Sequence, residues 1–182
     1  MPSTRYVHAV ARNLSELQRA ILNRRTLVAL EEERVVNLGF LRLAYLAIFN
    51  DYIAHCMKVF EESSRVASLW YLHRTDQHLV DAFASNSGID MTAMKAVSAK
   101  LKQIRDRTHF HIDADAVQEV RAVWRAAGLT GRELSGAVDA ALEIVTHLQQ
   151  HHSLPEVSLP DEYAAKHLRA QISKCANVID RR

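Results

Sequence analysis

The chain has 182 residues, a formal net charge of +2 and 48% hydrophobic residues, which is enough apolar content to bury the core of one domain. With only five glycines and three prolines, it lacks the turn residues that a many-stranded sheet requires, so we expect an all-α fold. A charge this small argues against a protein that grips duplex nucleic acid through many phosphates, but it is compatible with transient RNA contact.

The cysteines and the apolar runs indicate where in the cell the protein is expected. Cys56 and Cys175 are the only cysteines, and their spacing fits neither a zinc site nor a disulfide framework. The longest apolar run, Leu43 to Phe49, is too short to span a bilayer, and residues 1–13 lack the apolar segment of a signal peptide. We therefore expect a cytoplasmic protein with no membrane partner.

The first half of the chain predicts three or four helical segments. Asn13 or Ser15 is expected to cap a first amphipathic helix, and the second helix is expected from about Glu31 to Glu62. Leu14, Leu17, Ile21 and Val28 form the expected packing face of the first helix. The apolar band of the second is broad, which predicts the central and most buried helix. Residues 66–84 should form one or two shorter helices.

The second half begins with a predicted turn over residues 85–88, and Asp90 is expected to cap the next helix. That helix has an apolar stripe with alternating spacings of three and four residues. Its members are Met94, Val97, Leu101, Ile104, Thr108 and His111.

Three further signals complete the predicted bundle. Asp113 or Asp115 should cap a helix that contains Val120 and ends at Gly128, while Thr130 with Glu133 predicts a capping box for the following helix. We expect residues 1–153 to form the bundle. Residues 154–182 are expected to form a connector and a C-terminal helix that packs on the bundle or on a partner.

Arg105, Asp106 and His111 form the pattern most suggestive of chemistry, namely an arginine, a polar residue and a histidine near the end of a helix. On a regular helix the Cα atoms of Arg105 and His111 lie about 9 Å apart along the axis, so both side chains can reach one phosphate. Cleaving RNA without a metal requires a proton acceptor for the 2′-hydroxyl group and positive charge on the transition state. Histidine supplies the first and arginine the second.

These three residues resemble the motif of the HEPN superfamily of helical-bundle proteins. The run from Ile104 through Asp106 to His111 and Asp113 is similar to the abortive-infection (AbiU-like) branch, and the likeness extends over residues 10–150. The resemblance implies an antiparallel HEPN-like bundle over residues 1–153 that forms a homodimer, with the two motifs facing one another across a cleft. It also implies a metal-independent endoribonuclease of the abortive-infection or toxin type, which leaves 2′,3′-cyclic phosphate ends.

On this interpretation, His111 is the general base and Arg105 binds the phosphate and stabilises the transition state. Asp106 either orients Arg105 or, being almost opposite the apolar stripe, is solvated or reaches another subunit. Phe110 faces away from the predicted core and is expected to contact a second subunit. The expected RNA-binding residues are Lys102, Arg107 and His109. We expect RNA and a second copy as partners, an antitoxin or other regulatory protein as a further one, and no metal or other cofactor.

Other interpretations stay open at this point. A catalytically inactive HEPN module would bind RNA, a nucleotide or a partner protein through the same cleft, and a purely structural bundle would make the motif a coincidence. Asp51 with His55, and His147 with His151, have metal-compatible spacings but no third ligand, so we favour structural roles for both pairs. Trp70 and Tyr71 are able to stack on bases, although packing is the more common role of such aromatics.

Overall fold

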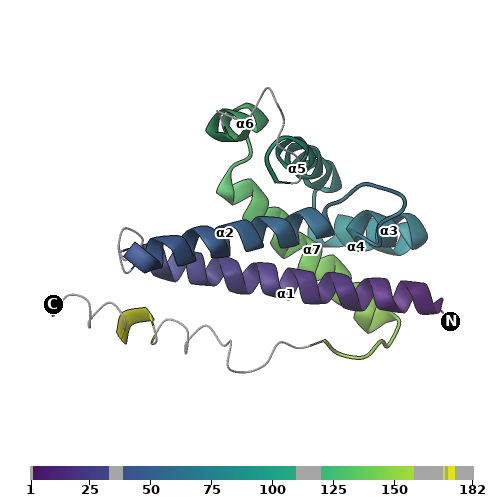
Figure 1. Ribbon diagram of the computed structural model, residues 1–182. Coiled ribbons are helices and arrows are strands. Elements are labelled where there is room, and N and C mark those ends of the chain that lie inside the picture. The colour runs from purple at the N-terminus through teal and green to yellow at the C-terminus, as the bar shows by residue number, and fades with distance from the viewer. Residues whose placement is uncertain (1, 33–38, 110–119, 158–169, 171, 175–182) are drawn as a thin grey trace.

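The computed structural model describes residues 2–32, 39–109, 120–157, 170 and 172–174. These residues form packed helices and no strand, which confirms the predicted all-α bundle (Figure 1). The elements are α1 (Thr4–Glu32), α2 (Gly39–Val59), α3 (Leu69–Thr75), α4 (Gln77–Ser87), α5 (Met91–Ile104), the π-helix η2 (Arg105–His109), α6 (Val120–Ala127) and α7 (Gly131–His151). Among the described helices, none has both the length and the apolar character that crossing a membrane requires.

The core forms where α1 packs against α2 and α7 (Figure 1). Its fully buried side chains come from helices that are far apart in the sequence, including Leu17 of α1, Leu72 of α3 and Ile144 of α7. Burying each such side chain contributes roughly 1.5–3 kcal/mol relative to leaving it in water. The predicted packing helices at each end of the bundle therefore meet in one core.

The start of α1 differs from the prediction. The helix begins at Thr4, so neither Asn13 nor Ser15 caps it. Asn13 is buried instead, and its Nδ2 donates to the carbonyl oxygens of Ala9, at 2.8 Å, and Ala67, at 2.7 Å. An asparagine within a helix is tolerated when its amide finds such partners, and the Ala67 carbonyl belongs to a distant loop that local sequence does not reveal.

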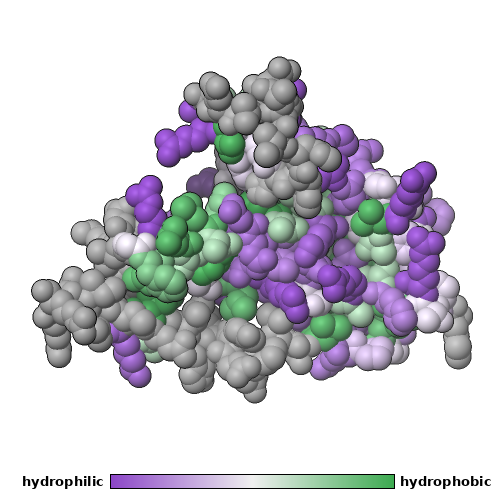
Figure 2. Space-filling view, in the orientation of Figure 1, coloured by the Kyte–Doolittle hydropathy of each residue, from purple (hydrophilic) through white to green (hydrophobic). Residues whose placement is uncertain are grey.

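The predicted burial of the second helix is wrong for its first half. Side chains from Tyr52 to Val59 include the buried ones of α2, whereas none from Gly39 to Asp51 is buried. Phe40 and Leu43 are 79% and 66% exposed, and Val28 of α1, expected on the packing face, is 44% exposed. Apolar composition predicts burial only where partner surface is available, and Figure 2 shows hydrophobic side chains gathered at the surface over this part of α2.

Most of the later helix boundaries follow the predicted signals. Asp90 caps α5 by accepting hydrogen bonds from the backbone nitrogens of Thr92 and Ala93, and Thr130 forms the expected capping box with Glu133. The predicted turn over residues 85–88 is wrong in its first three positions, because α4 continues to Ser87. Gly88 then ends the helix in the left-handed conformation, with φ of 68°, which glycine adopts without strain.

The predicted connector begins on the bundle. Gln149 Nε2 donates to the Pro155 carbonyl at 2.6 Å, and Gln18 Nε2 donates to the Val157 carbonyl at 2.5 Å. Ala170 and residues 172–174 are helical, within the predicted last helix. The capping and contact roles predicted for Asp113, Asp115 and Phe110 fall outside the described residues.

The loop between α2 and α3 contains Glu61, and hydrogen bonds hold it near both of its ends. Ser68 Oγ donates to the Glu61 carbonyl at 2.5 Å, while Asn13 holds the Ala67 carbonyl. Because these bonds replace water for buried backbone groups, they fix the loop against α1.

Replacing Asn13 with alanine tests this anchor. We expect Asn13→Ala to lower the free energy of unfolding by about 1–3 kcal/mol, because it leaves a carbonyl in the protein interior without a partner. Urea denaturation followed by circular dichroism measures the loss. Asn86→Ala, at an exposed position of α4, is the matched control and should change stability by less than about 0.5 kcal/mol. Equal effects of the two substitutions would contradict the anchor.

Candidate functional site

The helix that carries the motif changes its geometry just where the motif begins. Met94, Val97, Leu101 and Ile104 are buried, as the predicted stripe requires. The α-helix ends at Ile104, and residues 105–109 form the π-helix η2, so the expectation of a regular helix is wrong there. Thr108 Oγ1 donates back to the Ile104 carbonyl at 2.7 Å. A π-turn changes the direction of the side chains that follow it and is frequent at functional sites.

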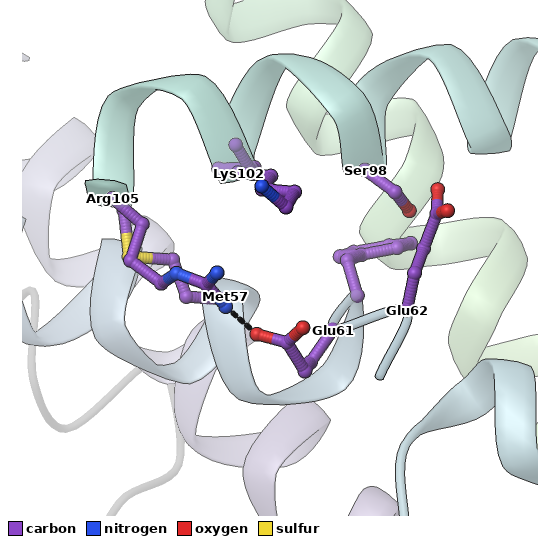
Figure 3. A pocket seen from close by; sticks show the side chains of 8 residues that line it. Met57, Glu61, Glu62, Ser98, Lys102 and Arg105 are labelled. Carbon is purple, nitrogen blue, oxygen red and sulfur yellow. Dashed lines mark ion pairs between the residues drawn. The ribbon is translucent and has the colours of Figure 1, made fainter. Parts of the chain in front are cut away.

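Arg105 lies at this junction and is held by two carboxylates. Its Nη1 forms an ion pair with Glu61 Oε2, so the two side chains point toward one another across the end of α2 (Figure 3). Asp106 Oδ1 accepts from Arg105 Nη2 at 2.7 Å and from Nε at 2.9 Å. The Arg105 side chain is 23% exposed. The guanidinium plane is therefore fixed from two sides while part of it still reaches solvent.

Asp106 contacts the Arg105 side chain, as one of its three predicted alternatives requires. Lys102 Nζ contacts Asp106 Oδ2 at 2.7 Å, so the carboxylate bridges two cations. Partial burial raises the pKa of Asp106, but the hydrogen bonds from Lys102 and Arg105 outweigh it and bring that pKa below its ordinary value. Asp106 is thus charged at neutral pH and orients Arg105.

Glu61 is the site residue that the sequence did not reveal. It follows α2 and meets Arg105 only through the packing of α2 against α5, and no local spacing connects the two positions. With Glu61 included, the immediate cluster contains two cations, Lys102 and Arg105, and two anions. Its formal charges cancel.

The structure describes only some of the remaining predicted site residues. Arg107 is exposed and has no ion-pair partner among the described residues. The side chain of His109, and the whole of His111, lie outside the described residues, so the arginine and histidine of the motif are brought together only as far as Arg105. A small pocket beside Arg105, with a volume of about 10 Å³, holds no more than a single water molecule. A phosphate would approach Arg105 from its solvent side.

A second charged cluster, at His55, is buried between α1 and α2. The His55 side chain is 5% exposed, its Nδ1 faces Glu16 Oε2, and its Nε2 lies 3.1 Å from Asp51 Oδ2. In this arrangement both ring nitrogens are occupied. The described part of the chain contains no group of three or more side chains suited to a metal ion.

Glu16 is the centre of this His55 cluster. Lys58 Nζ lies 3.2 Å from Glu16 Oε2, and Arg12 Nη2 lies 2.6 Å from Oε1. Burial raises the pKa of Glu16, but the hydrogen bonds from His55 and Lys58 outweigh burial and leave the pKa below its ordinary value of 4.5. The pKa of Asp51 is lowered in the same way, with Asn23 as the main hydrogen-bond donor opposing burial. The cluster links α1 to α2, which is the structural role expected for Asp51 and His55.

The other histidine pair also contacts protein groups. His147 stacks on Phe83, with ring centroids 4.2 Å apart, and lies 6.1 Å from the ring of His151. The neighbouring His152 Nε2 lies 2.7 Å from Asp76 Oδ2. These contacts join the end of α7 to the segment that contains α4, again as a structural feature.

Comparisons with known proteins gave no match. No protein-family model, no curated protein and no solved structure matches this chain. The contacts around Arg105 therefore carry the functional proposal.

The Glu16 carboxylate gives a prediction for acid stability. We expect Glu16→Gln to lower the free energy of unfolding at pH 7 by roughly 2–4 kcal/mol, because His55 loses a charged partner in the interior. Since the folded-state pKa of Glu16 lies below 4.5, its contribution is fully present above pH 4.5 and is lost as pH falls through the folded-state value. The variant should therefore lose less stability than wild type on acidification.

Denaturant titrations at pH 7 and pH 3 measure both effects. Glu143→Gln, at an exposed position of α7, is the matched control and should follow the wild-type acid profile. A Glu16→Gln profile parallel to that of wild type would show that Glu16 contributes nothing to the acid response.

Proposed function

We propose that this protein is a metal-independent endoribonuclease of the abortive-infection or toxin type, built on a HEPN-like bundle. The observation that supports the proposal is the position of Arg105, which is partly buried at the end of α5 and oriented by Glu61 and Asp106. An arginine held in this way loses little freedom when it binds a phosphate, and its remaining N–H groups can stabilise charge as it develops.

In the proposed reaction, His111 accepts the proton of the ribose 2′-hydroxyl group. The 2′ oxygen attacks the adjacent phosphorus, and the bond from phosphorus to the 5′ oxygen breaks as that oxygen takes up a proton from water. His111 then releases its proton to the solvent. The products are a 2′,3′-cyclic phosphate and a 5′-hydroxyl end. Arg105 exchanges Glu61 for phosphate oxygens, Asp106 keeps the guanidinium oriented, and Lys102, Arg107 and His109 hold the RNA backbone.

We assign the exposed apolar face of α1 and α2 to a second copy of the chain. Phe40, Leu43, Leu46 and Val28 form this face, and each is at least 44% exposed. Together they expose on the order of 400 Å², about half of the roughly 800 Å² that each partner buries in a standard interface. Between Gly39 and Asn50 the only charged residue is Arg42, so little charge would be desolvated on association. The proposed dimer also includes the Phe110 contact and the facing of the two motifs.

A catalytically inactive module that binds RNA, a nucleotide or a partner protein is the second candidate. It is favoured by the neutral balance of charges around Arg105, which leaves no net positive charge in that cluster to stabilise a transition state. The two candidates share the binding residues and differ in whether a bond is broken.

Cleavage of a mixed RNA pool in EDTA distinguishes them. Wild type should cut the pool to 2′,3′-cyclic phosphate ends, and Arg105→Ala should reduce the rate by about 10²- to 10³-fold, because transition-state charge loses its partner. His111→Ala should abolish cutting. Product ends are read by sensitivity to a phosphatase before and after acid opening of the cyclic phosphate.

Arg25→Ala on α1 and His151→Ala on α7 are the matched controls, and both should cut at the wild-type rate. Folded wild-type protein that binds the pool without cutting it would favour the inactive module. Cutting by Arg105→Ala at the wild-type rate would contradict the site assignment.

The oligomeric state tests the assigned dimer face. Light scattering of wild type at micromolar concentration should give about twice the chain mass of 20.6 kDa. Leu43→Lys should shift the mass toward that of one chain, since a lysine in the centre of the apolar face must be desolvated. Val66→Lys, at another exposed apolar position, should remain dimeric. A monomeric wild type would refute the dimer.

A further inference from the structure

A pocket larger than the one at Arg105 lies where the loop after α2, helix α3 and the first turns of α5 meet. It has a volume of about 410 Å³, which is within the range of small-ligand sites. Its lining is part aromatic and apolar and part charged. The residues include Glu62, Trp70, His73, Arg74, Met91 and Lys95, and we call it the Trp70 pocket.

The aromatic wall of this pocket is held in place by the protein. Trp70 is 6% exposed, and its indole Nε1 donates to Ser98 Oγ at 2.8 Å. The His73 ring packs edge-on against it, with centroids 6.0 Å apart, and His73 Nε2 lies 2.8 Å from Asp81 Oδ1. A planar apolar ligand entering the pocket would therefore meet a preformed surface, which limits the entropy lost on binding.

The charges at the rim differ from those at Arg105. Arg74 and Lys95 are exposed and have no ion-pair partner among the described residues, and Glu62 is the only carboxylate in the lining. By contrast, Lys102 is neutralised by Asp106. The Trp70 pocket thus combines an apolar wall with two cations able to receive an anion. A nucleotide has this combination, because its base is planar and its phosphate is anionic.

One face of α5 connects the pocket to Arg105. Lys95, Lys102 and Arg105 lie on one side of the helix, and Ser98, which also belongs to this side, is buried and accepts the hydrogen bond from Trp70. Figure 3 shows Ser98, Lys102 and Arg105 along this side, with Glu62 beside Ser98. Lys95 and Arg105 are about 15 Å apart along the axis, a distance that a short run of single-stranded nucleotides spans.

We propose that the Trp70 pocket binds one nucleotide unit of a single-stranded RNA whose backbone continues along this face of α5 to Arg105. The base lies against Trp70 and Met91, and its phosphate contacts Arg74 and Lys95. The identity of the strand rests on the proposed ribonuclease function. The pocket gives that site a second point of contact outside the motif, so RNA is held at the Trp70 pocket while Arg105 receives the phosphate to be cut.

Tryptophan fluorescence provides a direct test, because the chain contains only two tryptophans. In a Trp124→Phe background, Trp70 is the sole reporter. The probe is a six-residue 2′-O-methyl oligoadenylate, which lacks the hydroxyl group needed for cleavage, so binding is measured separately from catalysis. We expect a saturable change in Trp70 fluorescence on titration.

Substituting the two cations at the rim of the pocket then tests whether they contact the phosphate. Arg74→Ala with Lys95→Ala should weaken binding at least about fivefold and reduce the slope of log affinity against log salt by about 0.7, the change expected when one phosphate of a single strand is no longer neutralised. Arg19→Ala with Arg25→Ala removes the same charge from exposed positions of α1 and should leave both quantities near the values of the background protein.

The results of these binding experiments test the pocket separately from the ribonuclease function. No fluorescence change, or equal weakening by the two double variants, would overturn the proposal even if the enzyme cuts RNA. Adenosine monophosphate binding as tightly as the oligonucleotide would show a free-nucleotide site and overturn the continued strand. Binding as predicted by a protein that never cuts RNA would leave the pocket standing while the ribonuclease function fails.

Discussion

The ion pair between Arg105 and Glu61 is the contact on which the candidate site depends. It joins the end of α5 to the segment after α2 at the point where α5 changes into η2. A partly buried guanidinium without a counter-charge would be costly, so Glu61 and Asp106 allow Arg105 to occupy this position in the free protein. In the proposed function, the same pairing imposes a competition, because the RNA phosphate takes the place of Glu61 at Arg105.

The cluster around Arg105 differs from the cluster around His55 in how deeply its charged side chains are buried. Glu16 and His55 have side chains 4% and 5% exposed, and their contacts are saturated by Arg12, Lys58 and Asp51. That arrangement can contribute to stability and to its pH dependence, but it offers no surface to a substrate. Around Arg105, by contrast, Lys102 and Arg107 are exposed, and a pocket with two further cations lies along the same helix. Arg107, Arg74 and Lys95 have no ion-pair partner among the described residues, whereas the charges of Glu16 and His55 are paired within the core.

Local signals in the sequence predicted the parts of the fold that depend on neighbouring residues. The Asp90 cap, the Thr130 capping box and the apolar stripe of α5 all follow from side chains within a few positions of one another. The features that were missed depend on distant contacts. Asn13 lies within a helix because Ala67 accepts from it, and Glu61 belongs to the site because α2 packs against α5. Neither contact has a spacing that can be recognised in one sequence.

The same distinction applies to the site. Arg105 and Asp106 were found through the motif, and Asp106 orients the arginine as one interpretation required. The first half of α2 has the composition of a core helix, yet none of its side chains is fully buried, because composition does not reveal how much partner surface is present. The exposed face and the Trp70 pocket became visible only from the packing of the helices.

The central claim is that single-stranded RNA lies along α5 between the Trp70 pocket and Arg105. The most direct measurement is photo-crosslinking of a 2′-O-methyl oligonucleotide carrying 4-thiouridine at each position in turn, with the crosslinked residues identified by mass spectrometry. The account predicts crosslinks in α3 and the first turn of α5 from one end of the strand, and in residues 105–109 from the other. Crosslinks confined to α1 or to the first half of α2 would contradict it.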